Sequence, residues 1–121
     1  VVFMSHILEH VENPINLLRF CNKSLRPGGV LILSLPNEQG LIHYKHPYFT
    51  NDGNHLYAFT EDNTKELLKY TNFEIKQFFY EYNTSLSTQL HLDNIFKLID
   101  YMPHFVRRKM AWAHWSIAQK K

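Results

Sequence analysis

The sequence predicts an α/β fold, in which helices cover a layered and largely parallel sheet. Residues 30–35 read V-L-I-L-S-L, a nearly continuous apolar run that is typical of a strand buried on both faces. Segments with helical spacing alternate with such short strand-like segments along the chain. The chain has 121 residues, of which 45% are hydrophobic and 20% are charged. This composition fits one globular domain and excludes a wholly disordered chain.

The first part of the chain predicts a strand, a helix and a second strand. Residues 1–4 (V-V-F-M) form a short apolar strand. Asn13 is the expected N-cap of a helix and Pro14 its first residue. Cys21 falls on the apolar face of this helix, so we expect it in the core. The run Pro27-Gly28-Gly29 ends the helix, and the strand at residues 30–35 follows.

The second part continues the alternation. Residues 37–59 are predicted to be a loop, and Thr60 the N-cap of a helix that ends at Asn72. Residues 73–82 alternate as a strand, with Phe73, Ile75 and Gln77 on one side and Glu74, Lys76 and Phe78 on the other. An amphipathic helix is predicted over 88–101. Residues 110–119 alternate as a final strand, although their alanine and glutamine residues also permit a helix.

Composition also bounds the partners of the chain. Thirteen basic and eleven acidic residues give a net charge of +2, which is too weak to indicate a nucleic-acid partner. The cluster Arg107-Arg108-Lys109 is expected to be a solvated face. No apolar run approaches the roughly 20 residues of a membrane span, so we expect no membrane partner. A single cysteine excludes an internal disulfide and fits a cytoplasmic location.

The stretch from residue 6 to residue 37 resembles the second half of class I S-adenosylmethionine-dependent methyltransferases. It contains E-H-V-E-N-P, L-R-P-G-G and L-P-N in the order and spacing found in that family. The later H-L-Y-A-F-T and N-F-E-I resemble the stretch leading into the family's sixth strand, and W-S-I-A-Q-K-K resembles its antiparallel seventh strand. The resemblance implies a partial Rossmann-like methyltransferase sheet, made of the family's strands four to seven with flanking helices.

The family's cofactor-anchoring features do not occur in this sequence. Its four glycines form no G-x-G-x-x-G loop. From this and from the start at Val1 we expect that 1–121 is the C-terminal half of a methyltransferase domain, without the N-terminal cofactor-binding half. The resemblance implies that Met4, Ser5, His6 and Ile7 lie nearest to S-adenosylmethionine, with a small molecule as methyl acceptor. For this chain alone we expect weak or no cofactor binding and no activity.

The run His6-x-x-Glu9-His10 is the first candidate for site chemistry. In a helix these positions share one face, and imidazole and carboxylate ligands suit zinc, manganese or iron. Some relatives, among them small-RNA 2′-O-methyltransferases, carry E-x-x-E-H here and bind a metal with a later histidine. The resemblance implies His55 as that later histidine, while His6 replaces the first glutamate. The alternative is that Glu9 and His10 only make hydrogen bonds.

Two further hypotheses remain open at this stage. His10 or His55 is a candidate general base for a hydroxyl acceptor, because an imidazole with a pKa near 6.5 accepts a proton at neutral pH. The alternative is that both are ordinary surface histidines. In a different class of function, residues 1–4 form an exposed sheet edge through which a non-enzymatic half-domain self-associates as a homodimer and serves as an assembly or binding module.

Overall fold

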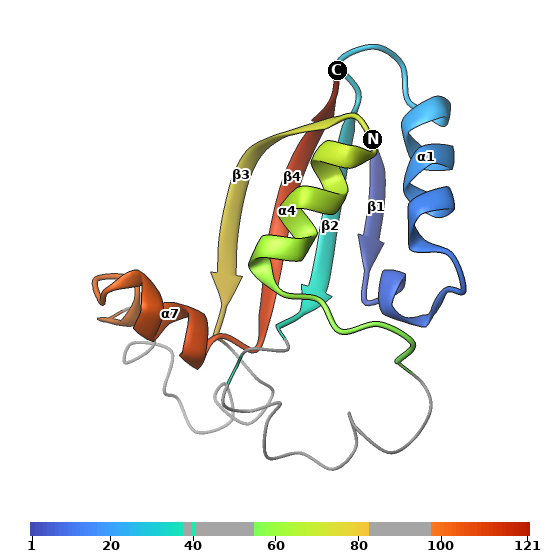
Figure 1. The fold of residues 1–121 in the computed structure, drawn as a ribbon. Coiled ribbons are helices and arrows are strands. Elements are labelled where there is room, and N and C mark those ends of the chain that lie inside the picture. The colour runs from blue at the N-terminus through green and yellow to red at the C-terminus, as the bar shows by residue number, and fades with distance from the viewer. Residues whose placement is uncertain (38–39, 41–54, 83–97) are drawn as a thin grey trace.

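The computed structural model describes residues 1–37, 40, 55–82 and 98–121, which form a four-stranded sheet with helices packed on it (Figure 1). The α/β prediction is therefore confirmed. The strands are β1 (Val2–Ser5), β2 (Val30–Pro36), β3 (Phe73–Glu81) and β4 (Ala113–Lys120). The helices are the 3₁₀ turn η1 (Leu8–His10), α1 (Pro14–Ser24), α4 (Glu61–Tyr70) and α7 (His104–Met110).

The strand order across the sheet is β1-β2-β4-β3. Strands β1 and β2 are parallel, whereas β4 runs antiparallel to both of its neighbours, β2 and β3 (Figure 1). The last strand of the chain is thus inserted between two earlier ones, which confirms the predicted antiparallel final strand. The strand alternative for residues 110–119 is correct, but β4 starts only at Ala113, because α7 extends to Met110.

Helix α1 begins where its sequence signals predict. The Asn13 side chain accepts a hydrogen bond of 3.0 Å from the backbone N–H of Asn16, and Pro14 occupies the first turn, where its missing N–H costs nothing. At the other end Gly28 has φ +73°, a left-handed conformation that favours glycine. Helix α4 starts with a capping box, in which the side-chain oxygens of Thr60 and Asn63 each accept a hydrogen bond from the backbone N–H of the other residue.

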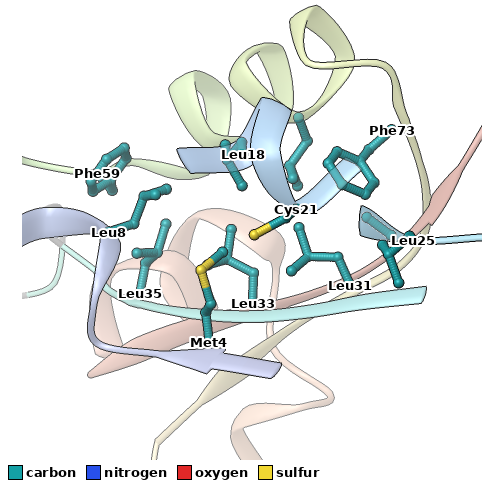
Figure 2. Packing of buried hydrophobic residues seen from close by; sticks show 12 residues of the cluster. Met4, Leu8, Leu18, Cys21, Leu25, Leu31, Leu33, Leu35, Phe59 and Phe73 are labelled. Atoms are coloured by element: carbon teal, nitrogen blue, oxygen red, sulfur yellow. The ribbon is translucent and has the colours of Figure 1, made fainter. Parts of the chain in front are cut away.

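The hydrophobic core lies between one face of the sheet and the helices α1 and α4. Leu31, Leu33 and Leu35 of β2 all point toward the helices, where Leu18 and Cys21 of α1 meet them (Figure 2). All five side chains are buried, as predicted for Cys21, and burial raises the pKa of its thiol. The other members of the cluster are Met4, Leu8, Leu25, Phe59, Leu68, Phe73 and Ala118.

The opposite face of the sheet carries a row of aromatic side chains. The ring of Phe3 lies 5.9 Å from that of Trp115, which stacks on Phe79 at 6.2 Å. The register explains the row, because Phe3 pairs with Ile32 and Trp115 with Ser34, the β2 residues that alternate with the buried leucines. Phe3 is 60% exposed and Phe79 is 46% exposed. We call Phe3, Trp115 and Phe79 the aromatic row.

Strand β3 departs from the strict alternation expected for it. A bulge between Ile75 and Gln77 shifts the register against β4. Phe73 and Ile75 pack on the core, and beyond the bulge Phe78 stacks on His114 and lies beneath Lys65 of α4. The prediction that Phe78 faces away from Phe73 and Ile75 was therefore wrong.

Several predictions fall outside the described residues. Most of the loop at 37–59 and of the helix at 88–101 lies in residues 38–39, 41–54 and 83–97. In the described end of the predicted helix 88–101, the backbone N–H of Tyr101 donates a hydrogen bond to the Leu98 carbonyl. Helix α7 was not predicted. Among the helices of the described residues, none is long and apolar enough to cross a membrane.

Candidate functional site

The carboxyl end of β1 is the first part of the candidate site. Immediately after Ser5, the chain turns at His6, whose φ of +51° is unusual for a residue with a side chain. Its backbone N–H donates to the Ser34 carbonyl at 3.0 Å, so the turn is tied to the neighbouring strand. The His6 ring stacks on Trp112, with ring centres 6.4 Å apart. Strained backbone of this kind concentrates at functional sites.

The turn η1 follows at the same end of the sheet and carries Glu9 and His10. The Glu9 side chain is only 1% exposed, and neither of its carboxylate oxygens has a hydrogen-bond partner. Its Oε1 lies 3.6 Å from Nδ1 of His6 and 3.9 Å from Nε2 of His10. These two imidazoles are the basic groups that lie beside the buried carboxylate, and a buried charge without a partner is costly.

Residues 55–57, near the C-terminal end of the predicted loop, contact η1 and the residues that follow it. The Leu56 N–H donates to the Glu9 carbonyl at 2.7 Å, and the Tyr57 hydroxyl donates to the Glu12 carbonyl at 2.7 Å. These bonds bring the ring of His55 edge-on to that of His10, with 4.7 Å between centres. Burial lowers the pKa of His55, an effect that Glu9 partly opposes.

Three ligand-type side chains therefore converge. One ligand atom each from Glu9, His10 and His55 lies within 4.8 Å of the other two. His6 contacts Glu9 but is not a member of this group. We call Glu9, His10 and His55 the η1 cluster. Chemically, it offers two proton acceptors or a donor set for a divalent cation.

The four residues expected to line a cofactor differ in how much of each side chain is exposed. The Met4 side chain is 5% exposed and points into the core beneath α1, so it supports the strand from inside (Figure 2). Ser5 and His6 are half-buried, and Ile7 is 43% exposed. Of the four, only Ser5, His6 and Ile7 have exposed side-chain surface at the carboxyl end of β1.

A second polar network, around Glu61, was missed by the sequence analysis. The Glu61 carboxylate is buried and bonds to Lys65 and to the Tyr80 hydroxyl, and His104 lies 3.1 Å away. Although burial alone raises the pKa of Glu61, the hydrogen bonds from Lys65 and Tyr80 bring it below its ordinary value. The network lines a cavity of about 420 Å³. The only sequence signal was the acidic first turn of α4.

His114 is the second buried group that the sequence did not reveal. It is fully buried in β4, with Nε2 3.0 Å from the Thr64 hydroxyl of α4. Burial lowers the pKa of His114 to about 4, so the ring is neutral at pH 7. No local pattern in the sequence indicates its partner, because Thr64 lies 50 residues away.

The sheet has the order β1-β2-β4-β3, and its antiparallel last strand is the feature that the resemblance implied. The family model described as "Methyltransferase domain" matches residues 1–77, well over half of the chain. The chain belongs to this methyltransferase domain family. Among curated proteins, none matches the chain by sequence.

Solved structures give the same fold. The methyltransferase-domain chain is similar to a S-adenosylmethionine-dependent methyltransferase from Archaeoglobus fulgidus (TM-score 0.65, 19% identity) and to one from Mesorhizobium loti (TM-score 0.68, 15% identity). The match covers 98% of this chain in both cases, but 58% and 60% of those proteins. The [4+2]-cyclase SpnF is also similar (TM-score 0.60, 15% identity), with 98% of this chain and 48% of the cyclase covered.

Proposed function

We propose that residues 1–121 form the C-terminal half of an S-adenosylmethionine-dependent methyltransferase domain that acts on a small-molecule acceptor. The observation that carries the proposal is the placing of the strained His6 and the η1 cluster at the carboxyl end of β1, in a chain of the methyltransferase domain family. Ligands of doubly wound sheets bind beyond the carboxyl ends of the strands. The net charge of +2 gives little support for a nucleic-acid acceptor.

The side chains at the end of β1 fit one wall of a cofactor cleft. Ile7 offers an exposed apolar surface, and the stacked rings of His6 and Trp112 offer a planar one. Such surfaces suit a purine ring. S-adenosylmethionine, when bound, supplies the methyl group of its sulfonium. Ser5, His6 and Ile7 then orient the cofactor, and Met4 holds the strand in place through the core.

The histidines of the η1 cluster are proposed to serve the acceptor. Methyl transfer depends mainly on alignment of the nucleophile, and a base is needed when the acceptor is a weakly acidic hydroxyl. His10 is 42% exposed and can receive that proton at a ring nitrogen. His55 is the alternative base, and its lowered pKa keeps the ring neutral at pH 7. Glu9 stabilises the imidazolium that forms.

Calorimetry with S-adenosylmethionine, together with an assay for release of S-adenosylhomocysteine, tests the half-domain proposal. We expect weak or no binding and no turnover by this chain, because it has no glycine-rich loop through which backbone approaches the cofactor. Tight one-to-one binding or turnover by the chain alone would contradict the proposal that it holds only one wall of the cleft.

A second candidate function is self-association as an assembly module. Among the described strands, β1 pairs with β2 alone, so its other edge is open to pairing with another chain. Phe3 of the aromatic row lies at this edge and is 60% exposed. Exposed apolar surface beside an open edge favours a homodimer.

Light scattering at concentrations of tens of micromolar tests this candidate. A homodimer is expected, and Phe3→Lys should convert it to a monomer, since a charge at the edge opposes strand pairing. Phe20→Lys is the matched control, because Phe20 is 68% exposed on α1 and outside the aromatic row. A wild-type protein that is strictly monomeric would refute the candidate.

A further inference from the structure

The cavity of about 420 Å³ beside the Glu61 network lies apart from the candidate site at β1. It is lined by residues of α4, β3 and α7, where α7 lies near the carboxyl end of β3 (Figure 1). Strands β1 and β3 are the two outer strands of the described sheet. Most of the lining residues follow residue 77, where the family match ends. The volume falls within the range of roughly 300–1,000 Å³ that is typical of small-molecule sites.

Arg107 of α7 brings an unsatisfied cation to this cavity. Its Nε is buried and has no hydrogen-bond partner, and none of the described carboxylates forms an ion pair with its guanidinium. The adjacent Arg108 differs, because it pairs with Asp62 at 3.3 Å. A buried donor without an acceptor is costly, so an acceptor from outside the chain is its expected partner. The guanidinium matches a carboxylate especially well, since it donates two parallel hydrogen bonds to the two oxygens.

The walls of the cavity are aromatic. The rings of Phe78 and Tyr80 meet edge-on with 5.6 Å between centres, and the ring of Tyr82 lies 6.4 Å from that of Tyr80. Burial raises the pKa of Tyr82 to about 12, an effect that Asp100 strengthens and Arg107 opposes. The Tyr82 hydroxyl therefore stays protonated at pH 7 and can donate a hydrogen bond. Aromatic walls favour a ligand that itself carries a ring.

The acidic groups of the cavity leave Arg107 uncompensated. The Glu61 carboxylate is already engaged, because Lys65 and the Tyr80 hydroxyl both donate to it. Asp100 is exposed, so solvent screens its charge, and it forms no ion pair with Arg107 among the described residues. The cavity thus offers a free guanidinium beside aromatic rings.

We propose that this cavity binds a small aromatic carboxylate, with its carboxylate on the Arg107 guanidinium and its ring against Phe78, Tyr80 and Tyr82. The Tyr82 hydroxyl is the second donor to the carboxylate. The inference goes beyond the proposed methyl transfer and does not depend on it, because no residue of the η1 cluster or of the end of β1 lines the cavity.

Calorimetric titration of the chain with benzoate tests the proposal. One equivalent should bind, and acetate, which lacks the ring, should bind at least about tenfold more weakly. Arg107→Gln should weaken benzoate binding by at least about tenfold, and Tyr82→Phe should weaken it by less. Asp100→Asn should strengthen binding, since it removes a negative charge beside the anion. The matched control is Arg108→Gln, which changes the charge equally one position along α7 but outside the cavity, and it should leave the affinity unchanged.

Thermal unfolding separates a lost ligand contact from a damaged fold. Without ligand, Arg107→Gln should be no less stable than Arg108→Gln, because only Arg108 loses an ion pair within the described part of the chain. Benzoate should raise the Tm of the wild type and of Arg108→Gln, but not that of Arg107→Gln.

Three results would overturn the proposal: absence of one-to-one binding, equal benzoate affinity in the wild type and Arg107→Gln, or tighter binding of the cation benzylamine than of benzoate. No S-adenosylmethionine is present in these experiments. Their failure therefore leaves the proposed methyl transfer untouched, and failure of methyl transfer leaves the carboxylate site untouched.

Discussion

Acid should destabilise this protein through His114, and the effect can be calculated from the structure. The ring is fully buried beneath α4, and burial brings its pKa from 6.5 to about 4. The charged and titratable groups that act on it are Glu61, which opposes the shift, and His6 and Lys65, which add to it. The folded protein therefore keeps the ring neutral between pH 6.5 and 4, where the unfolded chain takes up a proton.

The sign and size of the effect follow from that difference. Because the unfolded state binds more protons in this range, the free energy of unfolding falls as the pH falls from about 7 to about 4. The two pKa values correspond to a total loss of about 3 kcal/mol. Between pH 7 and pH 5, His114 alone accounts for about 2 kcal/mol of this loss. Glu61, whose pKa is lowered from 4.5, adds its own loss only at lower pH.

Urea unfolding at pH 7, 6 and 5, followed by tryptophan fluorescence, measures the loss. In His114→Gln the loss between pH 7 and pH 5 should be smaller than in the wild type by about 2 kcal/mol. The difference between the two proteins removes the contribution of His55, whose lowered pKa acts in the same direction in both. Thr64→Val keeps the buried imidazole and should retain most of the wild-type pH dependence. Equal losses in the wild type and in His114→Gln would refute the reasoning.

Three further predictions concern the fold and are checked by the same urea unfolding at pH 7. Leu33→Ala should lower the free energy of unfolding by about 2–5 kcal/mol, because Leu33 is only 1% exposed and lies in the core. Ile32→Ala is the control: Ile32 is partly exposed on the opposite face of the sheet, so its loss should lower the free energy of unfolding by less. Asn13→Ala should lower the free energy of unfolding by about 1 kcal/mol, because it removes the N-cap of α1. Asn16→Ala, at an exposed position of the same helix, should change the free energy little, and equal effects of the two substitutions would argue against the cap. Asn37→Ala should cost about 2 kcal/mol, because the Asn37 amide donates to the carbonyls of Arg108 and Ala111; a change below about 0.5 kcal/mol would show that these bonds are dispensable.

The elements that the sequence predicted well are those with local signals. The apolar run at 30–35 predicted β2, and Asn13-Pro14 and Thr60 predicted the starts of α1 and α4, because caps and strand patterns act within a few residues. The antiparallel final strand followed from alternation together with the family resemblance. Helix α7 lacked such a signal, since it has no side-chain cap and no buried residue.

Contacts across the fold account for what the sequence could not predict. The bulge in β3 depends on its register with β4 and is invisible in the alternation of Phe73–Glu81 itself. The His114–Thr64 and Tyr80–Glu61 pairs join residues 50 and 19 positions apart. In the candidate site, the predicted spacing placed His6, Glu9 and His10 close together, and ring nitrogens of His6 and His10 lie 3.6 and 3.9 Å from Oε1 of Glu9. The left-handed backbone of His6 also stacks its ring on Trp112, a contact 106 positions along the chain that no local spacing indicates.

The central claim is that the carboxyl end of β1 forms one wall of an S-adenosylmethionine cleft. Amide chemical shifts of the ¹⁵N-labelled chain, recorded while S-adenosylmethionine is added to millimolar concentration, test it most directly. The account predicts weak, unsaturated shifts at Ser5, His6 and Ile7, with none at residues of the β3 edge such as Gln77. Shifts confined to other residues, or their complete absence, would contradict the placing of the wall. Saturation at one equivalent would instead contradict the proposal that the chain holds only half of the cleft.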